Sequence, residues 1–341
     1  MANPEARLCP SDLESDIKTT TLGQTGLHVS RIAFGTWQLG GEWGHFDEDA
    51  AISAIRRARE LGVNFFDTAQ AYGFGASERI LGKALRDELT SERDELVIAT
   101  KGGLRQTDSG LVRDASPEWL RRGVDASLTA LGIDHIDLYQ VHWPDPTVPA
   151  ADTAGALGEL VADGKVRHVG VSNYDAAQMA EFAATLPVET LQPPYHLFRR
   201  EIEDEVLPYC RTHDIGVLVY GPLAHGLLTG TLSADTAFAD DDWRSASGVF
   251  SGDTFRRNLA TVRALEIFAA DRDVSVSQLA IAWTLANPAV HVAIVGARQS
   301  SHVEDSLRAA EVSLTDADLD DIDKIMTSAT PVAGPSPEGM P

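Results

Sequence analysis

Four side chains that together could carry out acid–base chemistry follow three successive apolar segments of the chain. Asp67 comes directly after the first segment, and Tyr72 lies five residues later. Lys101 and His142 come directly after the next two segments. The pKa of tyrosine is near 10, too high for easy proton donation at neutral pH, but a nearby ammonium lowers it and a carboxylate holds that ammonium in place. Because an imidazole beside them can orient a carbonyl oxygen, the set predicts proton transfer to a carbonyl or from an alcohol.

Each of these residues also has an ordinary structural interpretation. A single Lys or Asp at a strand end more often forms a loop salt bridge than takes part in catalysis, and a lone His after a strand is more often structural. Four such residues after three neighbouring strands favour a shared site. We therefore treat Asp67, Tyr72, Lys101 and His142 as the candidate catalytic group.

Short apolar segments alternate with amphipathic ones along almost the whole chain. Those rich in Val and Ile predict buried strands at residues 32–34, 63–66, 96–100, 136–141, 166–171, 190–192, 217–220 and 292–295. Helical patterns lie between them at residues 49–60, 77–88, 117–130, 151–162, 176–184, 201–213, 255–270 and 303–309. Eight such units favour an α/β fold, a single (β/α)8 TIM barrel, over an open doubly wound sheet. The strand ends of a parallel barrel surround one opening, so the four candidate residues would converge there.

Segments outside this repeat complete a single domain over residues 1–341. Residues 19–30, with Gly23 and Gly26 in the turn, predict an N-terminal β-hairpin that could close the bottom of the barrel. Residues 224–254 follow the seventh strand and predict an extended loop on the C-terminal face. We expect a disordered N-terminus at 1–18, the barrel plus a C-terminal helix (316–326) within 31–326, and an extended or mobile tail at 327–341.

Composition narrows the class of protein. The chain has 341 residues, with 51 acidic against 28 basic side chains and a formal net charge of -23. A field of that sign disfavours nucleic-acid and membrane-surface partners. The two cysteines suggest neither a disulfide framework nor a zinc site, so a protein without a metal is expected. No signal peptide or membrane span is predicted, so a cytoplasmic location is expected. The acidic surface fits either an ordinary acidic protein or one adapted to high salt.

Several familiar signatures are absent. Gly73-Phe74-Gly75 begins like a dinucleotide-binding fingerprint, but Glu78 stands at the third glycine position. No P-loop, zinc-protease helix or nucleophile-elbow motif occurs. A Rossmann dehydrogenase, a P-loop NTPase and a serine hydrolase are therefore disfavoured.

Three motifs carry a specific resemblance. The segment from Gly62 to Gly82, which contains Asp67-Thr68-Ala69 and Tyr72-Gly73, is similar to the hallmark of the aldo-keto reductases. So are Ala99-Thr100-Lys101-Gly102-Gly103 and Gln140-Val141-His142-Trp143-Pro144, and the likeness runs from about residue 20 to 325. The resemblance implies a barrel that binds a nicotinamide cofactor across its mouth. It also implies Tyr72 as general acid, Asp67 and Lys101 as residues that tune it, and His142 as the residue that orients the substrate oxygen.

The resemblance also implies a set of cofactor-binding residues. Ser172, Asn173 and Gln192 match positions that hold the nicotinamide carboxamide, and Tyr220 would stack on the ring. Gly221 stands where the family usually has Ser, and the loop around Leu228 would cover the pyrophosphate. The full set is Gly35, Thr36, Trp37, Ser172, Asn173, Gln192, Tyr220, Gly221, Pro222, Leu223, Gly226, Leu228, Gly296, Arg298, His302, Asp305 and Ser306.

Arg298 decides the expected cofactor. By the resemblance, it lies in the loop that receives the adenosine 2′-phosphate, and its planar guanidinium suits a phosphate dianion. The ordinary alternative is a solvated surface arginine. His302 and Ser306 depart from the residues common in relatives. NADP(H) is therefore favoured, with NAD(H) possible. The Tyr220–Leu223 sequence and the tail resemble the microbial general-stress branch of the family.

Three tryptophans are expected on the catalytic face. Trp37 and Trp143 would form a wall for an apolar or sugar-like substrate, and Trp43 would either join that wall or pack in the interior. The expected function is reversible hydride transfer between NADP(H) and an aldehyde or ketone, in a monomer or small homo-oligomer. Two alternatives stay open: an NADPH-binding redox-sensing or channel-associated subunit with little turnover, and a physiological alcohol or sugar dehydrogenase.

Overall fold

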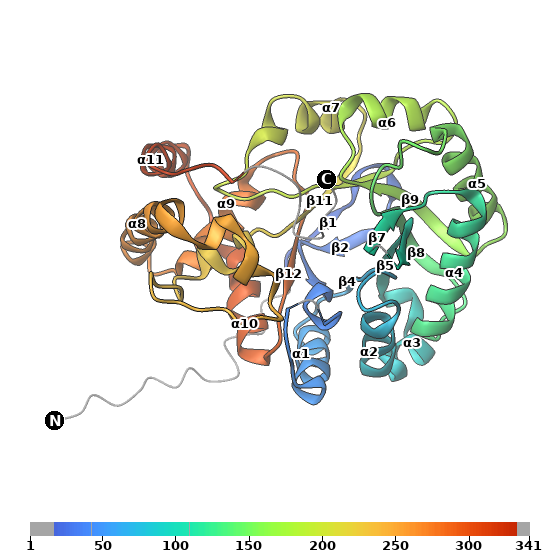
Figure 1. Ribbon diagram of the computed structural model, residues 1–341, viewed down its shortest axis with the longest axis horizontal. Helices are drawn as coiled ribbons and strands as arrows, with labels where there is room; N and C mark the ends of the chain where they lie inside the picture. Colours follow the sequence, from blue (N-terminus) through green and yellow to red (C-terminus); the bar gives the residue numbers. More distant parts are fainter. Residues whose placement is uncertain (1–16, 42, 109, 333–341) are drawn as a thin grey trace.

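The computed structural model describes residues 17–41, 43–108 and 110–332 (Figure 1). Its strands are β1 (Thr19–Thr21), β2 (His28–Ser30), β3 (Ile32–Gly35), β4 (Phe65–Asp67), β5 (Val97–Gly102), β6 (Leu104–Thr107), β7 (Gly110–Arg113), β8 (Ile136–Val141), β9 (Val166–Ser172), β10 (Thr190–Gln192), β11 (Gly216–Tyr220) and β12 (Val292–Gly296). Its helices are α1 (Glu48–Glu60), α2 (Ala76–Ala84), α3 (Arg86–Ser91), α4 (Pro117–Leu131), α5 (Ala150–Ala162), α6 (Ala176–Ala183), α7 (Val206–Thr212), α8 (Gly252–Ala270), α9 (Val276–Ala286), α10 (Ser300–Arg308) and α11 (Asp316–Met326). The expectations for residues 1–16 and 333–341 lie outside the described residues.

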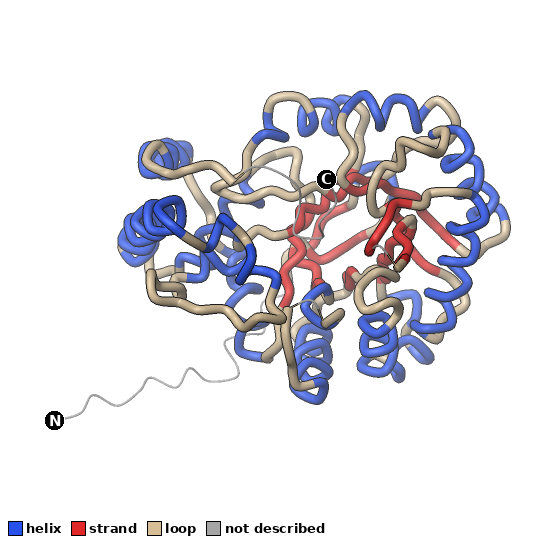
Figure 2. Tube along the Cα trace, in the orientation of Figure 1, coloured by secondary structure: helices blue, strands red, loops and turns tan. Residues whose placement is uncertain are grey.

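Eight parallel strands close into a barrel, in the order β10-β11-β12-β3-β4-β5-β8-β9. Helices surround the strands on the outside, as Figure 2 shows in blue around red. Strands β5 and β8 are buried along their whole length, because the barrel interior covers one face and helices cover the other. The predicted α/β barrel with an N-terminal hairpin is confirmed.

The barrel closes where the first barrel strand of the chain meets the last one. β3 pairs with β12, in the register Ala293 with Ile32. Arg31, just before β3, donates hydrogen bonds to the carbonyl oxygens of Leu285, Val290 and His291 at 3.0, 3.1 and 3.3 Å. One half-buried guanidinium therefore holds the segment that leads into β12 against the start of β3.

The β1–β2 hairpin covers the amino-terminal end of the barrel. The side chain of Leu22, in its turn, is completely buried against Gly216, the first residue of β11. A Cβ on Gly216 would lie 2.8 Å from the Leu22 side chain, so the close approach requires glycine there. The opposite, carboxyl-terminal end of the strands is left for the loops that carry the polar residues.

The helices agree with the predicted positions at most ends. α4 begins with Ser116 as its N-cap and Pro117 in its first turn, and it ends at Gly132 in the left-handed conformation. The helix expected over 77–88 is instead two helices, α2 and α3, because the chain bends at the fully buried Leu85. The helix expected over 201–213 is a short 3-10 turn followed by α7, because Glu205 leaves the helical conformation.

Two features were not expected from the sequence. Helix α9 lies between α8 and β12, and the β6–β7 hairpin follows β5 on the carboxyl-terminal face. The long segment after β11 contains the 3-10 turns η6 (Ala224–Thr229), η7 (Trp243–Ala246) and η8 (Gly248–Phe250). As Figure 1 shows, α8 and α11 lie side by side outside the barrel.

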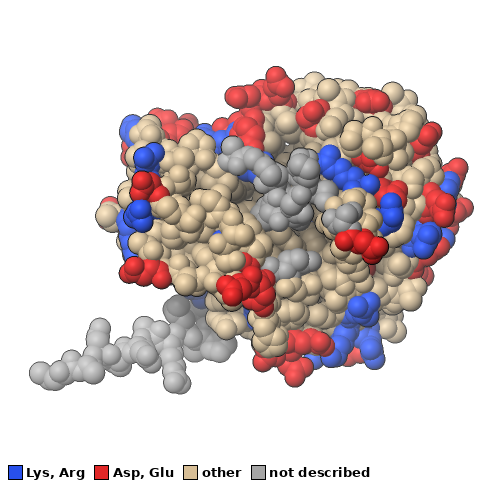
Figure 3. All heavy atoms as spheres, viewed as in Figure 1, with Lys and Arg blue, Asp and Glu red and all other residues tan. Residues whose placement is uncertain are grey.

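Acidic side chains outnumber basic ones in the chain, 51 against 28. On the face shown in Figure 3, acidic side chains lie around the rim, over the helices. Among the described residues, no helix is both long enough and apolar enough to cross a membrane.

Candidate active site

Lys101 lies at the centre of the candidate catalytic group. Its ammonium donates to Asp67 Oδ1 at 2.6 Å and to the carbonyl oxygen of Thr68 at 2.9 Å. It also lies 3.3 Å from Tyr72 OH and 5.0 Å from the centre of that ring. The Lys101 and Asp67 side chains are only 1% and 4% exposed. The structure therefore joins the acid, the amine and the phenol at the carboxyl ends of β4 and β5, shielded from water.

The loop that carries Tyr72 is held by backbone hydrogen bonds. Gln70 N donates to Lys101 O at 3.0 Å, and Ser77 N donates to Tyr72 O at 3.2 Å. Gly73 and Gly75 have positive φ angles of 62° and 91°, which glycine adopts at little cost. This tight turn sets the phenol beside the end of β5.

Ser77, in the first turn of α2, ties the ends of neighbouring strands together. Its hydroxyl donates to Thr36 Oγ1 at 2.7 Å and lies 3.2 Å from Thr68 Oγ1. Thr36 follows β3 and Thr68 follows β4. All three hydroxyls are buried, so the strand ends that surround the site are fixed by an internal network.

His142 follows β8 and faces Tyr72. The centres of the two rings are 5.7 Å apart, with the rings nearly perpendicular. Asn173 Nδ2 donates to the carbonyl oxygen of His142 at 3.0 Å. The imidazole and the phenol can thus both reach one small group placed between them.

Four polar residues form a chain beside this group. Tyr220 OH donates to Asn173 Oδ1 at 2.9 Å, and Ser172 Oγ donates to the carbonyl oxygen of Gln192 at 2.8 Å. Gln192 Nε2 donates to Asp67 Oδ2 at 2.9 Å. Asn173 has a φ of 63°, which asparagine tolerates better than most residues. The ends of β9, β10 and β11 thereby present hydroxyl and amide groups next to the Asp67–Lys101 pair.

A cavity of about 520 Å³, the main cavity, opens above these residues. It is lined by Asp67, Tyr72 and His142 and by all the predicted cofactor positions except Leu228, namely Gly35, Thr36, Trp37, Ser172, Asn173, Gln192, Tyr220, Gly221, Pro222, Leu223, Gly226, Gly296, Arg298, His302, Asp305 and Ser306. Lys101 lies just beneath the lining, and Leu228 is fully buried behind it. Trp143 does not line this cavity; its ring lies against the guanidinium of Arg113.

Sequence reasoning missed the contribution of the segment after β11, in which His225 lines the main cavity and Trp243 packs against His225. His225 and Trp243 form a cluster of aromatic rings with Trp37 and Trp43, whose centres lie 5.0 to 6.4 Å apart. Trp43 is only 6% exposed and pairs with Asp242 through a backbone bridge. This segment therefore reaches across the cavity to the loop after β3.

Two arginines, Arg244 and Arg298, line the main cavity beside Trp43. Arg298 donates to the carbonyl oxygen of Trp43 at 2.7 Å, and Arg244 forms an ion pair with Asp242 at 2.6 Å. Burial lowers the pKa of Arg298, and the positive charge of Arg244 lowers it further. The pKa of Asp242 is lowered too: its hydrogen bonds with Arg244 and the nearby positive charges outweigh the opposing effect of burial. The part of the cavity lined by Arg244 and Arg298 is suited to an anion, which would relieve the repulsion between the two guanidiniums.

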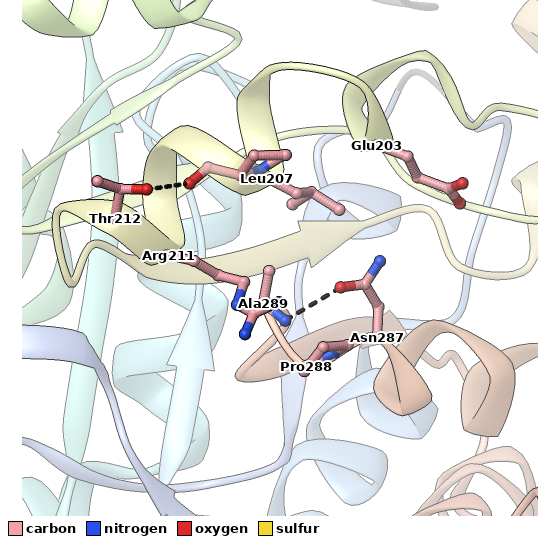
Figure 4. A pocket seen from close by; sticks show the side chains of 8 residues that line it. Glu203, Leu207, Arg211, Thr212, Asn287, Pro288 and Ala289 are labelled. Carbon is pink, nitrogen blue, oxygen red and sulfur yellow. Dashed lines mark hydrogen bonds between the residues drawn. The ribbon is translucent and has the colours of Figure 1, made fainter.

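A second cavity lies beside α7, near the amino ends of the strands (Figure 4). Its polar groups already bond within the protein: Asn287 Oδ1 accepts from Ala289 N at 3.0 Å, and Glu203 Oε1 accepts from Tyr195 OH at 2.6 Å. Within the described part of the chain, no cluster of three potential metal ligands occurs. The chemistry is therefore concentrated in the main cavity.

Comparisons with known proteins agree with this geometry. Residues 31–327 match the aldo/keto reductase family. The chain is 42% identical to the aldo-keto reductase YhdN of Bacillus subtilis over 90% of this chain and 93% of that protein. It is 34% identical to an NADH-specific methylglyoxal reductase of Escherichia coli over 89% and 96% of the two chains. The structure of the glycerol dehydrogenase AKR11B4 from Gluconobacter oxydans superposes with a TM-score of 0.83, at 37% identity, covering 94% of this chain and 97% of that one.

Proposed function

The chain belongs to the aldo/keto reductase family, NAD(P)H-dependent oxidoreductases that act on carbonyl groups, and on that premise we propose that it reduces an aldehyde or ketone with NADPH as preferred cofactor and Tyr72 as proton donor. The observation that carries the proposal is the buried Lys101 ammonium, which lies between Asp67 Oδ1 at 2.6 Å and Tyr72 OH at 3.3 Å.

The four residues of the candidate catalytic group have separate roles. A bound nicotinamide supplies the hydride for the carbonyl carbon. Tyr72 donates the phenolic proton to the carbonyl oxygen, and the Lys101 ammonium stabilises the phenolate left behind. Asp67 holds that ammonium in place, and His142 orients the carbonyl oxygen. In the reverse direction the same phenolate removes the proton of an alcohol.

The residues of the main cavity fit a nicotinamide dinucleotide. Ser172, Asn173 and Gln192 offer hydroxyl and amide groups to a carboxamide, and Tyr220 offers an aromatic face. Gly221 has no side chain at the position where relatives have Ser, so backbone N–H groups would serve the pyrophosphate there. The remaining predicted cofactor residues, apart from the buried Leu228, also line this cavity.

A preference for NADPH is supported by the two arginines that line the main cavity, Arg244 and Arg298. Arg298 and Arg244 are close enough for like-charge repulsion, which a 2′-phosphate dianion would relieve. One of the similar proteins is NADH-specific, so the family does not decide the cofactor. The preference rests on the charges in this cavity.

The aromatic cluster points to the class of substrate. Trp37 lies 6.3 Å from Tyr72, ring centre to ring centre, and the two rings are stacked. We infer that Trp37 contacts an apolar or sugar-like substrate, while Trp143 stays a prediction for the rim of the site. The Tyr220–Leu223 sequence supports a place in the microbial general-stress branch.

Alcohol oxidation is the second candidate, since a similar structure is that of a glycerol dehydrogenase. The test measures NADPH oxidation with aldehydes, aldoses and methylglyoxal, and NADP+ reduction with polyols, for the wild type and for Tyr72→Phe. Wild-type turnover should fall by roughly 10² to 10⁴ in the variant, because general acid catalysis is lost. Equal turnover of both proteins would contradict the role of Tyr72. Tight NADPH binding without turnover in the wild type would favour a redox-sensing or channel-associated subunit instead.

A further inference from the structure

Four buried polar atoms lie between the sheet and helices α2 and α4, directly behind Lys101. They are Gln70 Oε1, Glu78 Oε2, Ser127 Oγ and Tyr139 OH, and none makes a well-aligned hydrogen bond among the described residues. Glu78, Ser127 and Tyr139 are at most 1% exposed. Buried polar atoms without a partner are rare in native proteins, and a buried water usually satisfies them.

Two of the four atoms face a common space beside Gly123. Tyr139 OH and Gln70 Oε1 lie 3.0 and 3.1 Å from the position that a Cβ on Gly123 would occupy. The two atoms are therefore at most about 6 Å apart and make no direct bond, a separation that one water can bridge. The absence of a side chain on Gly123 leaves that space open.

Glu78 on α2 and Ser127 on α4 lie close to each other and near Tyr139, since Ser127 and Tyr139 each interact with the Glu78 carboxyl. The pKa of the Glu78 carboxyl is raised above its ordinary value, because the effect of burial is larger than the opposing effects of its neighbours. Those neighbours, which each lower the pKa, are Ser127, Thr100, Arg79 and Lys101. Burial, and secondly the charge of Glu78, raises the pKa of the Tyr139 phenol. A carboxyl group, two hydroxyls and an amide oxygen provide both donors and acceptors for a water.

We propose that Gln70, Glu78, Ser127 and Tyr139 bind one buried water, and that this network holds in place the strand segment that carries Lys101. The second half of the proposal rests on the proposed reductase function, whereas the first half does not. The four residues are positioning residues, since none of them lines the main cavity.

The network fixes the backbone on both sides of Lys101. On one side, Thr100 Oγ1 donates to Glu78 Oε1 at 2.7 Å. On the other side, Gly102 packs against Tyr139 so closely that a Cβ there would lie 1.9 Å from the phenol oxygen. Gln70 N donates to the carbonyl oxygen of Lys101 itself at 3.0 Å. Loosening these contacts would change the 3.3 Å distance from the ammonium to Tyr72 OH, on which the proton affinity of the phenol depends.

The water is tested by a crystal structure of the wild-type protein that resolves ordered solvent. We expect one water within about 3 Å of at least three of the four atoms. Direct hydrogen bonds among the four groups, with no water between them, would overturn the first half of the proposal. This result does not depend on any catalytic activity.

The positioning role is tested by the pH dependence of kcat for carbonyl reduction in Tyr139→Phe and Ser127→Ala. We expect the apparent pKa of the kcat profile to shift by at least about 0.5 unit, because the Lys101–Tyr72 distance sets it. The KM for NADPH should stay the same, since neither residue lines the cavity. The matched control is Tyr195→Phe, which removes a buried hydroxyl from the Glu203 contact near the amino ends of the strands.

A second variant separates positioning from folding. Glu78→Gln preserves the shape of the side chain and an oxygen that can accept from Thr100, so it should keep the wild-type profile, with circular dichroism showing the same fold in all variants. Wild-type profiles in both Tyr139→Phe and Ser127→Ala, or an equal shift in Tyr195→Phe, would overturn the positioning role. A wild-type protein that reduces no carbonyl would overturn both the proposed function and the positioning role, but not the water site.

Discussion

The buried pair of Asp67 and Lys101 allows stability and catalysis to be separated by experiment. We consider three variants: Asp67→Asn, Lys101→Met and the double variant that carries both changes. Each single variant removes one charge and leaves the other buried. In the Lys101→Met variant, the Asp67 carboxylate would keep the hydrogen bond from Gln192 Nε2, at 2.9 Å. The double variant leaves no buried charge.

The expected magnitudes follow from the distance and the burial of the pair. At an effective dielectric constant of about 20, two charges separated by 2.6 Å attract by roughly 6 kcal/mol, most of which offsets the cost of removing both from water. Breaking such a pair by removing one partner costs about 3–5 kcal/mol of unfolding free energy. The double variant should lose about 0–2 kcal/mol, because replacing a whole buried pair with neutral groups is often nearly neutral.

Urea unfolding followed by circular dichroism measures these differences, and NADPH oxidation measures the rate. All three variants should lose roughly 10² to 10⁴ in kcat, because the phenolate loses either the Lys101 ammonium or the carboxylate that holds this ammonium in place. The matched control is Lys83→Met, which breaks the Lys83–Glu48 pair. That pair has a similar N–O distance of 2.7 Å but side chains that are 55% and 51% exposed, so the loss should be only about 0–1 kcal/mol.

Two results would refute this reasoning. A double variant whose stability loss equals the sum of the two single losses would mean that the charges do not interact through a dry interior. A Lys101→Met variant with the wild-type rate would mean that Tyr72 does not depend on the ammonium.

Three further predictions concern other parts of the protein. Arg298→Ala should weaken NADPH binding by roughly 10- to 100-fold and NADH binding by less than about threefold in fluorescence titrations, and an equal loss for both would argue against a 2′-phosphate contact. The pKa of Asp318 is lowered to about 2 by hydrogen bonds from Thr315 and by Arg272, so this carboxylate adds stability that is full above 3.8 and is lost as the pH falls towards 2. The stability difference between wild type and Asp318→Asn should therefore shrink over that range, and a constant difference would contradict the assignment. With a net charge of -23, the melting temperature should rise between dilute buffer and molar KCl; a flat response would rule out adaptation to high salt.

The barrel strands were predictable because each is a short Val/Ile-rich segment bounded by turn residues, and the structure places all eight in one closed sheet. Helix α9 was missed for a physical reason. Its residues from Gln278 to Leu285 are all buried, so the segment has no polar face and no helical alternation in hydrophobicity. The available signal was the capping box at Ser275 and Gln278.

The convergence of Asp67, Lys101 and His142 followed from the strand ends, because parallel strands in a barrel bring their carboxyl ends together. The contributions of His225, Trp243 and Arg244 could not be predicted in the same way. They lie in a segment of 3-10 turns without regular periodicity, and their place above Trp37 depends on the backbone bridge between Trp43 and Asp242. Such long-range loop contacts leave no local pattern in the sequence.

The contact between Arg31 and the segment before β12 has a consequence for how the chain folds. Its three hydrogen bonds join residues that are 254 to 260 positions apart, and the β3–β12 ladder spans the same interval. Contacts of such high sequence separation carry the largest loop-closure entropy, so they form after the local β/α units. Closure of this seam is therefore expected to be a late, slow event in refolding, and an open-barrel intermediate would expose the edges of β3 and β12 to pairing with other chains.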